Sequence, residues 1–337
     1  MKITMIGTSG SGKTVFSAGV YSVFMRKEFE GFSVYPRGDG LPSQLIEAHR
    51  FTRDYKSLAN KRWPDGTKEF NLFPFDLYYQ GRKITKFDWI DYRGGVLDDP
   101  NIDAEMASDI YAHIAASDAV ILFADAHKLT ETYDPDEAAF LSGADAVCQI
   151  ISGFAKNYPG NKLSFLIALT KCDAISKEWK GKDNSYSPLI EHGIKAFHPL
   201  GNIYKRERLW RGGIIPVSTM GEGTVNSNGD IVGFLKPLNI GHVMAFCVSS
   251  TLRHEQDDRL QTLINRGGRI DQIESQYKGF LGAIRRTFHF FNKANNDLGV
   301  LEEMRKEQMN DLAELNKIRR PVEALETIAL QKVRIIT

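Results

Sequence analysis

Gly7-Thr8-Ser9-Gly10-Ser11-Gly12-Lys13-Thr14 is the stretch that decides the fold, because it has the pattern G-x-x-x-x-G-K-T of a phosphate-binding loop. The apolar run 2–6 before it predicts a buried strand, and residues 15–29 after it contain few helix breakers and predict a helix. Strand, glycine-rich turn and helix are the context in which the motif binds phosphate. The alternative is a Gly/Ser-rich turn that fits the pattern by chance, and this context disfavours it.

The residue types of this loop suit phosphate chemistry. Glycines let successive backbone N–H groups point at phosphate oxygens, and the following helix adds the positive end of its dipole. Lys13 is predicted to reach the β- and γ-phosphates, and Thr14 to offer its hydroxyl to Mg²⁺. The nucleotide contacts of this region are therefore assigned to Gly7, Ser9, Gly10, Ser11, Gly12, Lys13, Thr14 and Val15.

Length and composition set limits on the function. The 337 residues suffice for one large or two ordinary domains with a sizeable core. The 43 basic and 42 acidic residues nearly balance, which argues against binding to nucleic acid or to a membrane surface. Three scattered cysteines lack metal spacing and indicate a reducing compartment. We see no leader and no apolar run of the roughly 18 residues that span a bilayer, and we expect a cytoplasmic protein without a transmembrane segment.

Residues 32–66 contain several prolines and glycines and predict an insertion between loops, with one helix at 43–59. A mobile loop is the alternative. The alternating apolar pattern of 69–79, a turn at 80–83 and the run 84–90 then predict an antiparallel hairpin.

The hairpin ends at Asp91-Tyr92-Arg93-Gly94, a D-x-x-G motif after an apolar strand. In P-loop enzymes such an Asp holds Mg²⁺ through water and the Gly amide contacts the γ-phosphate, which assigns these roles to Asp91 and Gly94. Thr67 lies just before the hairpin, where a switch residue would place its hydroxyl on the metal. The alternatives are an ordinary strand-starting threonine, or Thr52 or Thr85 in the switch role.

From residue 102 onward, helical and strand patterns alternate. Helices are predicted at 102–117, 134–157, 188–197 and 241–264, and buried strands at 119–125, 163–169 and 213–219. This alternation predicts an α/β fold with a mostly parallel sheet, one antiparallel hairpin strand and helices on both faces. A ligand is expected at the carboxyl ends of the strands, where all of these motifs lie.

With Thr170-Lys171-Cys172-Asp173 following a strand, the order of motifs resembles the GTPase class of P-loop proteins, in its Ras-like, translation-factor-related branch. The resemblance covers about residues 1–250. It implies that Asp173 selects guanine by accepting from its ring N–H and amine, and that Lys171 supports the base. Thr170 stands where many members have Asn. Ser218 and Thr219 fall where the family contacts the guanine carbonyl through backbone N–H groups.

One departure concerns hydrolysis. Many Ras-like proteins place a Gln directly after D-x-x-G to orient the attacking water, whereas this chain has Gly95. Intrinsic hydrolysis is therefore predicted to be slow or to use a group from elsewhere. Arg93 is a candidate charge stabiliser, and Arg37 and Arg62 are further candidates. For each of the three, a solvated surface role is the favoured alternative.

A narrower resemblance is to bacterial GTPases of conflict and defence systems. It rests on Trp63-Pro64-x-Gly66-Thr67, on the insertion, and on Lys236-Pro237-Leu238-Asn239.

The last third, 251–337, is predicted to be a helical extension, with apolar stripes over 270–291 and 298–318, an interruption at Pro321 and a short helix at 322–333. The helices either pack on the GTPase core or on each other, or bind a protein partner or a second copy.

The leading hypothesis is a Mg²⁺-dependent GTP switch that hydrolyses GTP to GDP and acts on a protein partner or on self-assembly. The alternatives are a guanine-nucleotide-binding module with negligible hydrolysis, and a P-loop ATPase or small-molecule kinase.

Overall fold

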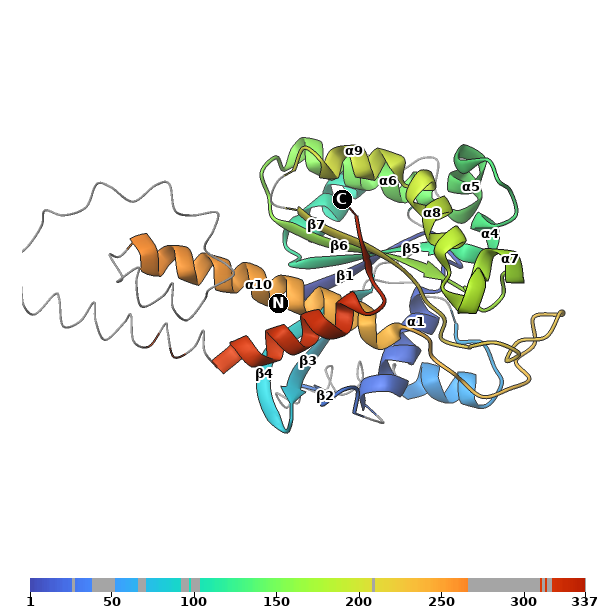
Figure 1. Cartoon of the computed structure of the whole chain (residues 1–337), viewed down its shortest axis with the longest axis horizontal. Coiled ribbons are helices and arrows are strands. Elements are labelled where there is room, and N and C mark those ends of the chain that lie inside the picture. Colours follow the sequence, from blue (N-terminus) through green and yellow to red (C-terminus); the bar gives the residue numbers. More distant parts are fainter. Residues whose placement is uncertain are drawn as a thin grey trace, which may run out of the picture. The chain divides into compact units, whose positions relative to one another are not determined.

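The computed structural model describes residues 1–25, 28–37, 52–65, 71–91, 97, 104–207, 210–265, 310, 313 and 317–336. Its centre is an eight-stranded sheet with the order β2-β3-β4-β1-β5-β6-β7-β8 (Figure 1). The strands are β1 (Lys2–Ile6), β2 (Phe32–Pro36), β3 (Asn71–Tyr79), β4 (Arg82–Asp91), β5 (Ala119–Asp125), β6 (Leu163–Thr170), β7 (Trp210–Pro216) and β8 (Arg334–Ile335).

Strands β4, β1, β5, β6 and β7 run parallel, and β3 pairs antiparallel with β4 as the expected hairpin. The sheet therefore confirms the α/β class and the mostly parallel arrangement. Strands β5 and β6 are buried along their whole length, because helices cover both faces of the sheet.

Both edges of the sheet differ from the expectation. Residues 32–36, assigned above to the insertion, form β2, which pairs antiparallel with β3. Phe32 stacks on Tyr79 there, with ring centroids 4.4 Å apart, and this packing outweighs the proline at the end of the strand. At the other edge, β8 pairs antiparallel with β7; no strand was predicted after the helix expected at 322–333.

The helices alternate with the strands along the chain. They are α1 (Lys13–Val20), a π-helix (Tyr21–Met25), a helix at 52–59, α3 (Ala104–Ala115), α4 (Ala126–Leu129), α5 (Pro135–Ser142), α6 (Ala144–Asn157), α7 (Lys177–Lys180), a 3₁₀ turn (Lys182–Asn184), α8 (Ser187–Ala196), α9 (His198–Tyr204), α10 (Ile240–Asn265) and a helix at 317–330. Helices α6, α8 and α9 lie on one face of the sheet, and α1 lies on the other (Figure 1).

The prediction of one helix over 134–157 is wrong, because the chain forms α5 and α6 with an 85° bend between them. The bend is at Gly143, whose φ of 81° is left-handed and is readily adopted only by glycine. Asp134 caps α5 as expected, since its carboxylate accepts from the N–H groups of Asp136 (2.8 Å) and Glu137 (3.1 Å).

The insertion helix at 52–59 packs on α1. Leu58 is fully buried and forms an apolar cluster with Ala18, Met220 and Ile231. Beyond the helix, Trp63 Nε1 donates to the carbonyl of Gly229, at 2.9 Å. The insertion helix and Trp63 thus contact the 218–238 segment. The expected helix start at Ser43 lies outside the described residues.

The chain divides into two compact units, Met1–Thr251 with Ala324–Thr337, and Leu252–Glu323. Residues 317–330 are helical through Pro321, so the interruption expected there does not occur. Ile318, Val322 and Leu325, one helical turn apart, are all buried, and this burial outweighs one missing N–H donor. The apolar stripe at 270–291 lies outside the described residues.

No single helix in the described part of the chain is long and apolar enough to cross a membrane.

Candidate nucleotide-binding site

The phosphate-binding motif forms a tight loop between β1 and α1. Gly10 and Gly12 have left-handed φ values of 71° and 93°. Gly7 is buried, and a Cβ atom there would lie 2.7 Å from the Cβ of Phe123 on β5, so only glycine fits. Ser9 and Gly10 are exposed at the tip of the loop, whereas the side chain of Ser11 is buried.

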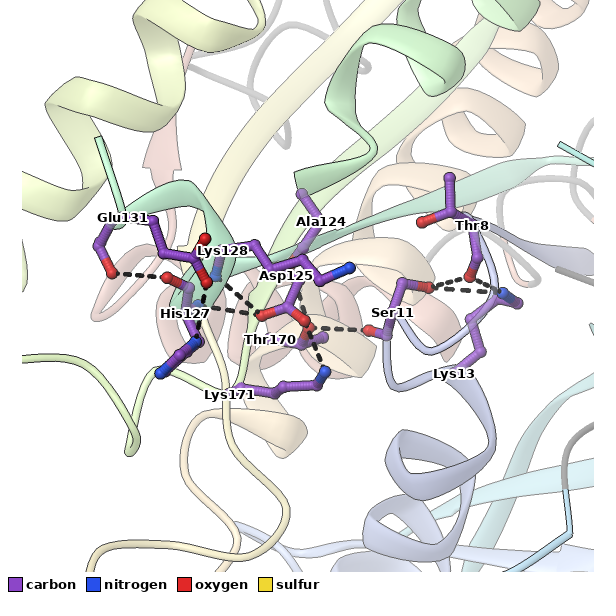
Figure 2. A network of polar contacts seen from close by, with 11 residues as sticks. Thr8, Ser11, Lys13, Ala124, Asp125, His127, Lys128, Glu131, Thr170 and Lys171 are labelled. Carbon is purple, nitrogen blue, oxygen red and sulfur yellow. Dashed lines mark hydrogen bonds and ion pairs between the residues drawn. The ribbon is translucent and has the colours of Figure 1, made fainter. Parts of the chain in front are cut away.

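Lys13 crosses the inside of this loop. Its Nζ donates to the carbonyl of Gly7 at 2.7 Å. It also donates to the carbonyl of Thr8 (2.9 Å) and lies 3.4 Å from Ser11 Oγ (Figure 2). These contacts hold the ammonium group at the concave side of the loop, although it is only 6% exposed. A buried ammonium that a phosphate oxygen can approach is a suitable anion ligand.

The loop is supported from the α5–α6 bend. A Cβ at Gly143 would lie 2.4 Å from Thr8 Oγ1, so the bend touches the loop through a position without a side chain. This contact was not predictable from the sequence, because residues 8 and 143 share no motif. Glycine at the break between the helices therefore allows both the bend of the chain and its close contact with the loop.

Thr170 joins the T-K-x-D motif to the phosphate-binding loop. Its hydroxyl donates to the carbonyl of Ser11 at 2.8 Å and lies 3.0 Å from the carbonyl of Ala124 on β5 (Figure 2). Thr170 is 5% exposed. The two motifs, far apart in the sequence, thus meet by a direct side-chain contact at the carboxyl ends of β1, β5 and β6.

Lys171 directly follows β6 with a left-handed φ of 56°. Its ammonium group pairs with Asp125 Oδ2 at 2.5 Å, while its side chain remains 44% exposed. Asp125 was expected only to end a strand, and its ion pair with Lys171 was not predicted from the sequence.

Asp173 lies in the turn after β6, and its side chain is half-buried. The turn is held by its neighbours: Lys180 Nζ donates to the Asp173 carbonyl at 3.1 Å and to the Glu222 carboxylate at 3.0 Å. Cys172 is fully buried, and this burial raises the pKa of its thiol to about 12, so the thiol stays neutral. The Asp173 carboxylate thus belongs to a turn that the Lys180 hydrogen bond and the buried Cys172 hold in place.

The side chains of Ser218 and Thr219 face the protein. Ser218 Oγ accepts from the N–H of Gly221 at 2.8 Å, and Thr219 packs against Gly19 of α1, where an added Cβ would lie 2.9 Å from its hydroxyl. Both residues are buried. Their side chains are occupied in structure, and a ligand contact by this segment falls to its backbone.

Thr14 and Asp91 are the described candidates for Mg²⁺. Thr14 is the second residue of α1, next to Val15, and the 3% exposed Asp91 ends β4 beside Met5 of β1. A carboxylate and a hydroxyl are hard oxygen donors that fit Mg²⁺. Among described residues no group of three or more His, Cys, Asp or Glu could hold a metal alone, whereas Mg²⁺ on a nucleotide also uses phosphate oxygens.

Several predicted residues lie outside the described residues: Thr67, Arg93, Gly94 and Gly95.

The other two arginine candidates are described. Arg37 directly follows β2, and its guanidinium group lies 3.5 Å from Asp76 and 3.4 Å from Asp88 and donates to the carbonyl of Phe75. Arg62 is exposed after the insertion helix.

No protein-family model matches the chain, and no curated protein matches it. Among solved structures, it is similar to the signal recognition particle receptor SRb-GTP/SRX complex from Chaetomium thermophilum. The identity is 14% and the TM-score 0.36, over 66% of this chain and 92% of that one. The fold assignment therefore rests on the strand order and the loop themselves, and the narrower resemblance to defence-system GTPases gains no support.

Proposed function

We propose that the protein binds a guanine nucleotide, with its phosphates in the loop 7–14 and its base against Lys171 and Asp173. The observation that carries the proposal is the hydrogen bond from the Thr170 hydroxyl to the Ser11 carbonyl, at 2.8 Å. It brings a G-x-x-x-x-G-K-T loop and a T-K-x-D turn into one site. A nucleotide has charged phosphates at one end and a hydrogen-bonding base at the other, so it could contact the loop with one end and the turn with the other.

Guanine presents a ring N–H and an amine to a carboxylate, whereas adenine presents no such pair of donors. A half-buried Asp173 carboxylate facing adenine would lose solvation without gaining hydrogen bonds, which disfavours ATP. The backbone N–H groups near Ser218 and Thr219 suit a guanine carbonyl. Base choice therefore rests on Asp173 and phosphate binding on the loop.

Thr14 and Asp91 would hold Mg²⁺, with Thr67 as a third ligand when a γ-phosphate is bound. The metal would neutralise phosphate charge. Lys13 would supply a further positive charge, because its ammonium already faces the loop interior.

We further propose that the protein hydrolyses GTP to GDP slowly and acts as a switch. Gly95 offers no side chain to orient water, so the rate is expected to be low unless a partner or Arg93 contributes. The helical extension 251–337 would transmit the nucleotide state to a protein partner or a second copy. Gly95 equally favours the second candidate, a nucleotide-binding module with negligible hydrolysis.

Calorimetric titration with GDP, a non-hydrolysable GTP analogue and an ATP analogue, each with Mg²⁺, tests the binding proposal. Wild type is expected to bind the guanine nucleotides only. Asp173→Ala should abolish this preference, whereas Asp109→Ala, an exposed carboxylate on α3, serves as the matched control and should change nothing. Equal binding of ATP and GDP by the wild type would refute the base assignment.

Single-turnover hydrolysis of GTP then separates the switch from the binding module. Slow conversion to GDP that Lys13→Ala abolishes supports the enzyme. Bound GTP that stays intact over many hours, in a protein whose guanine preference is established, supports the module.

A further inference from the structure

We infer that Asp125 is a positioning residue of the base site: its carboxylate holds Lys171 in place to support the guanine. The inference rests on the proposed function. It adds to the proposed site a residue that belongs to none of the sequence motifs. Asp125 is the last residue of β5 and is 4% exposed.

The two carboxylate oxygens of Asp125 have separate contacts. Oδ1 caps helix α4 by accepting from the N–H groups of His127 (3.0 Å) and Lys128 (3.3 Å). Oδ2 accepts from the ammonium group of Lys171 at 2.5 Å (Figure 2). The cap orients the carboxylate, so the second oxygen is held in a fixed direction toward the lysine.

The register of the sheet explains why this residue reaches Lys171. Asp125 pairs with Thr170 across β5 and β6, so Lys171 follows directly beyond the end of that pair. On the preceding residue, the Ala124 carbonyl lies 3.0 Å from the Thr170 hydroxyl. The last two residues of β5 thus contact the first two residues of the T-K-x-D turn, one through its backbone and the other through its carboxylate.

A lysine side chain loses considerable rotamer entropy when it is fixed, and Lys171 is still 44% exposed. Without a partner it would sample many conformations, and a bound base would have to order it. The ion pair orders the Lys171 side chain before the nucleotide binds. Less entropy is then lost on binding, which favours binding of the base. The contribution concerns the base end of the nucleotide, because the phosphates are bound by the loop.

The test uses Asp125→Asn and Lys171→Met in the full chain. Asparagine keeps an oxygen for the α4 cap but loses the negative charge; methionine keeps an apolar stem but loses the ammonium. Each variant is expected to bind GDP about tenfold more weakly than the wild type. The double variant should bind no more weakly than the weaker single variant, because both changes remove the same pair.

Asp134→Asn is the matched control. Asp134 caps α5 through the same two types of contact, to the N–H groups of Asp136 and Glu137, so the substitution is chemically identical. Its GDP affinity should equal that of the wild type. The apparent melting temperatures of Asp125→Asn and Asp134→Asn without nucleotide should both stay close to the wild-type value, since each retains its cap.

Binding of magnesium pyrophosphate distinguishes a role at the base from a purely structural role of Asp125. This ligand contacts the phosphate site without a base, so its affinity should be the same in the wild type and Asp125→Asn, while the affinity for GDP falls. Equal losses for both ligands would mean that Asp125 supports the whole loop, and would overturn the inference. Unchanged GDP binding in Asp125→Asn, or additive losses in the double variant, would also overturn it.

These failures differ from failure of the proposed function. If the wild type and Asp173→Ala show the expected guanine preference and loss, but Asp125→Asn binds GDP normally, only the positioning role is wrong. If the wild type binds no guanine nucleotide, both are wrong.

Discussion

The hydroxyl of Thr170 and the carbonyl of Ser11 are 2.8 Å apart although 159 positions separate them in the chain. Both atoms are buried, so their hydrogen bond is not exchanged with water. It connects the turn after β6 to the loop after β1.

Thr170→Val removes this hydroxyl at nearly constant volume. The buried Ser11 carbonyl would lose its donor and a methyl group would lie near the Ala124 carbonyl, so we expect the free energy of unfolding to fall by about 1–3 kcal/mol. GDP binding should weaken as well, because Ser11 belongs to the phosphate-binding loop. Urea denaturation and calorimetry measure the two effects. Thr130→Val is the control, since its hydroxyl bonds the His127 carbonyl at an exposed site and its loss should cost little; equal effects of the two substitutions would contradict the prediction.

Gly143→Ala tests the support that the α5–α6 bend gives to the loop. The new Cβ would lie 2.4 Å from Thr8 Oγ1, so the loop or the bend must shift. Gly160→Ala is matched to it: φ is 79° at Gly160 and 81° at Gly143, but no atom of the described chain lies within 4 Å of a Cβ at 160. Both should lose about 1 kcal/mol of stability from the left-handed backbone.

Only Gly143→Ala should lose more than this and also weaken nucleotide binding. Thermal unfolding with and without GDP distinguishes the two contributions. A Gly143→Ala protein as stable as Gly160→Ala would show that Thr8 moves aside freely.

Leu58→Ala tests whether the insertion helix is part of the core. Leu58 is fully buried beside Ala18, Met220 and Ile231, and we expect a loss of about 2–5 kcal/mol in unfolding free energy from denaturation curves. Leu330→Ala, at a position 61% exposed, should lose far less. A loss below 1 kcal/mol for Leu58→Ala would mean that the insertion separates from α1 easily.

The thiol of Cys172 should be unreactive in the folded protein. Burial raises its pKa to about 12, above the value in the unfolded chain, so the neutral thiol predominates at pH 8 and the thiolate forms only at strongly alkaline pH. Cys148 has its pKa raised to about 12 by burial, and Cys247 is also buried. Ellman's reagent at pH 8 should detect no thiol in the native state and three in denaturant. Rapid native reaction at Cys172 would show that the T-K-x-D turn opens.

The central strands could be predicted because burial on both faces imposes a continuous apolar pattern. Residues 2–6 and 119–125 were predicted with the bounds of β1 and β5. Strand β8 has two residues, too few for any periodic pattern, and forms only because β7 offers an unpaired edge. The bend at Gly143 was missed because an isolated glycine within an apolar helical pattern does not by itself end a helix.

Candidate site residues could be predicted where a motif carries its chemistry in consecutive residues. Lys13 and the Thr170–Asp173 turn could be named in this way. Asp125 could not, because its role depends on its register with Thr170, which only the folded sheet defines. The ligand roles of all these residues remain predictions, and Thr67, Arg93 and Gly94 also lie outside the described residues.

The pairing of Gly213 with Ile335 has a consequence for biosynthesis. While the chain is being translated, β7 emerges long before the segment that covers its outer edge. If the other strands pair during that interval, the nascent protein would present unpaired backbone donors and acceptors along the outer edge of β7. Such an edge is a template for pairing with another nascent chain, so a ribosome-associated chaperone that shields it would act on the interval between the two strands.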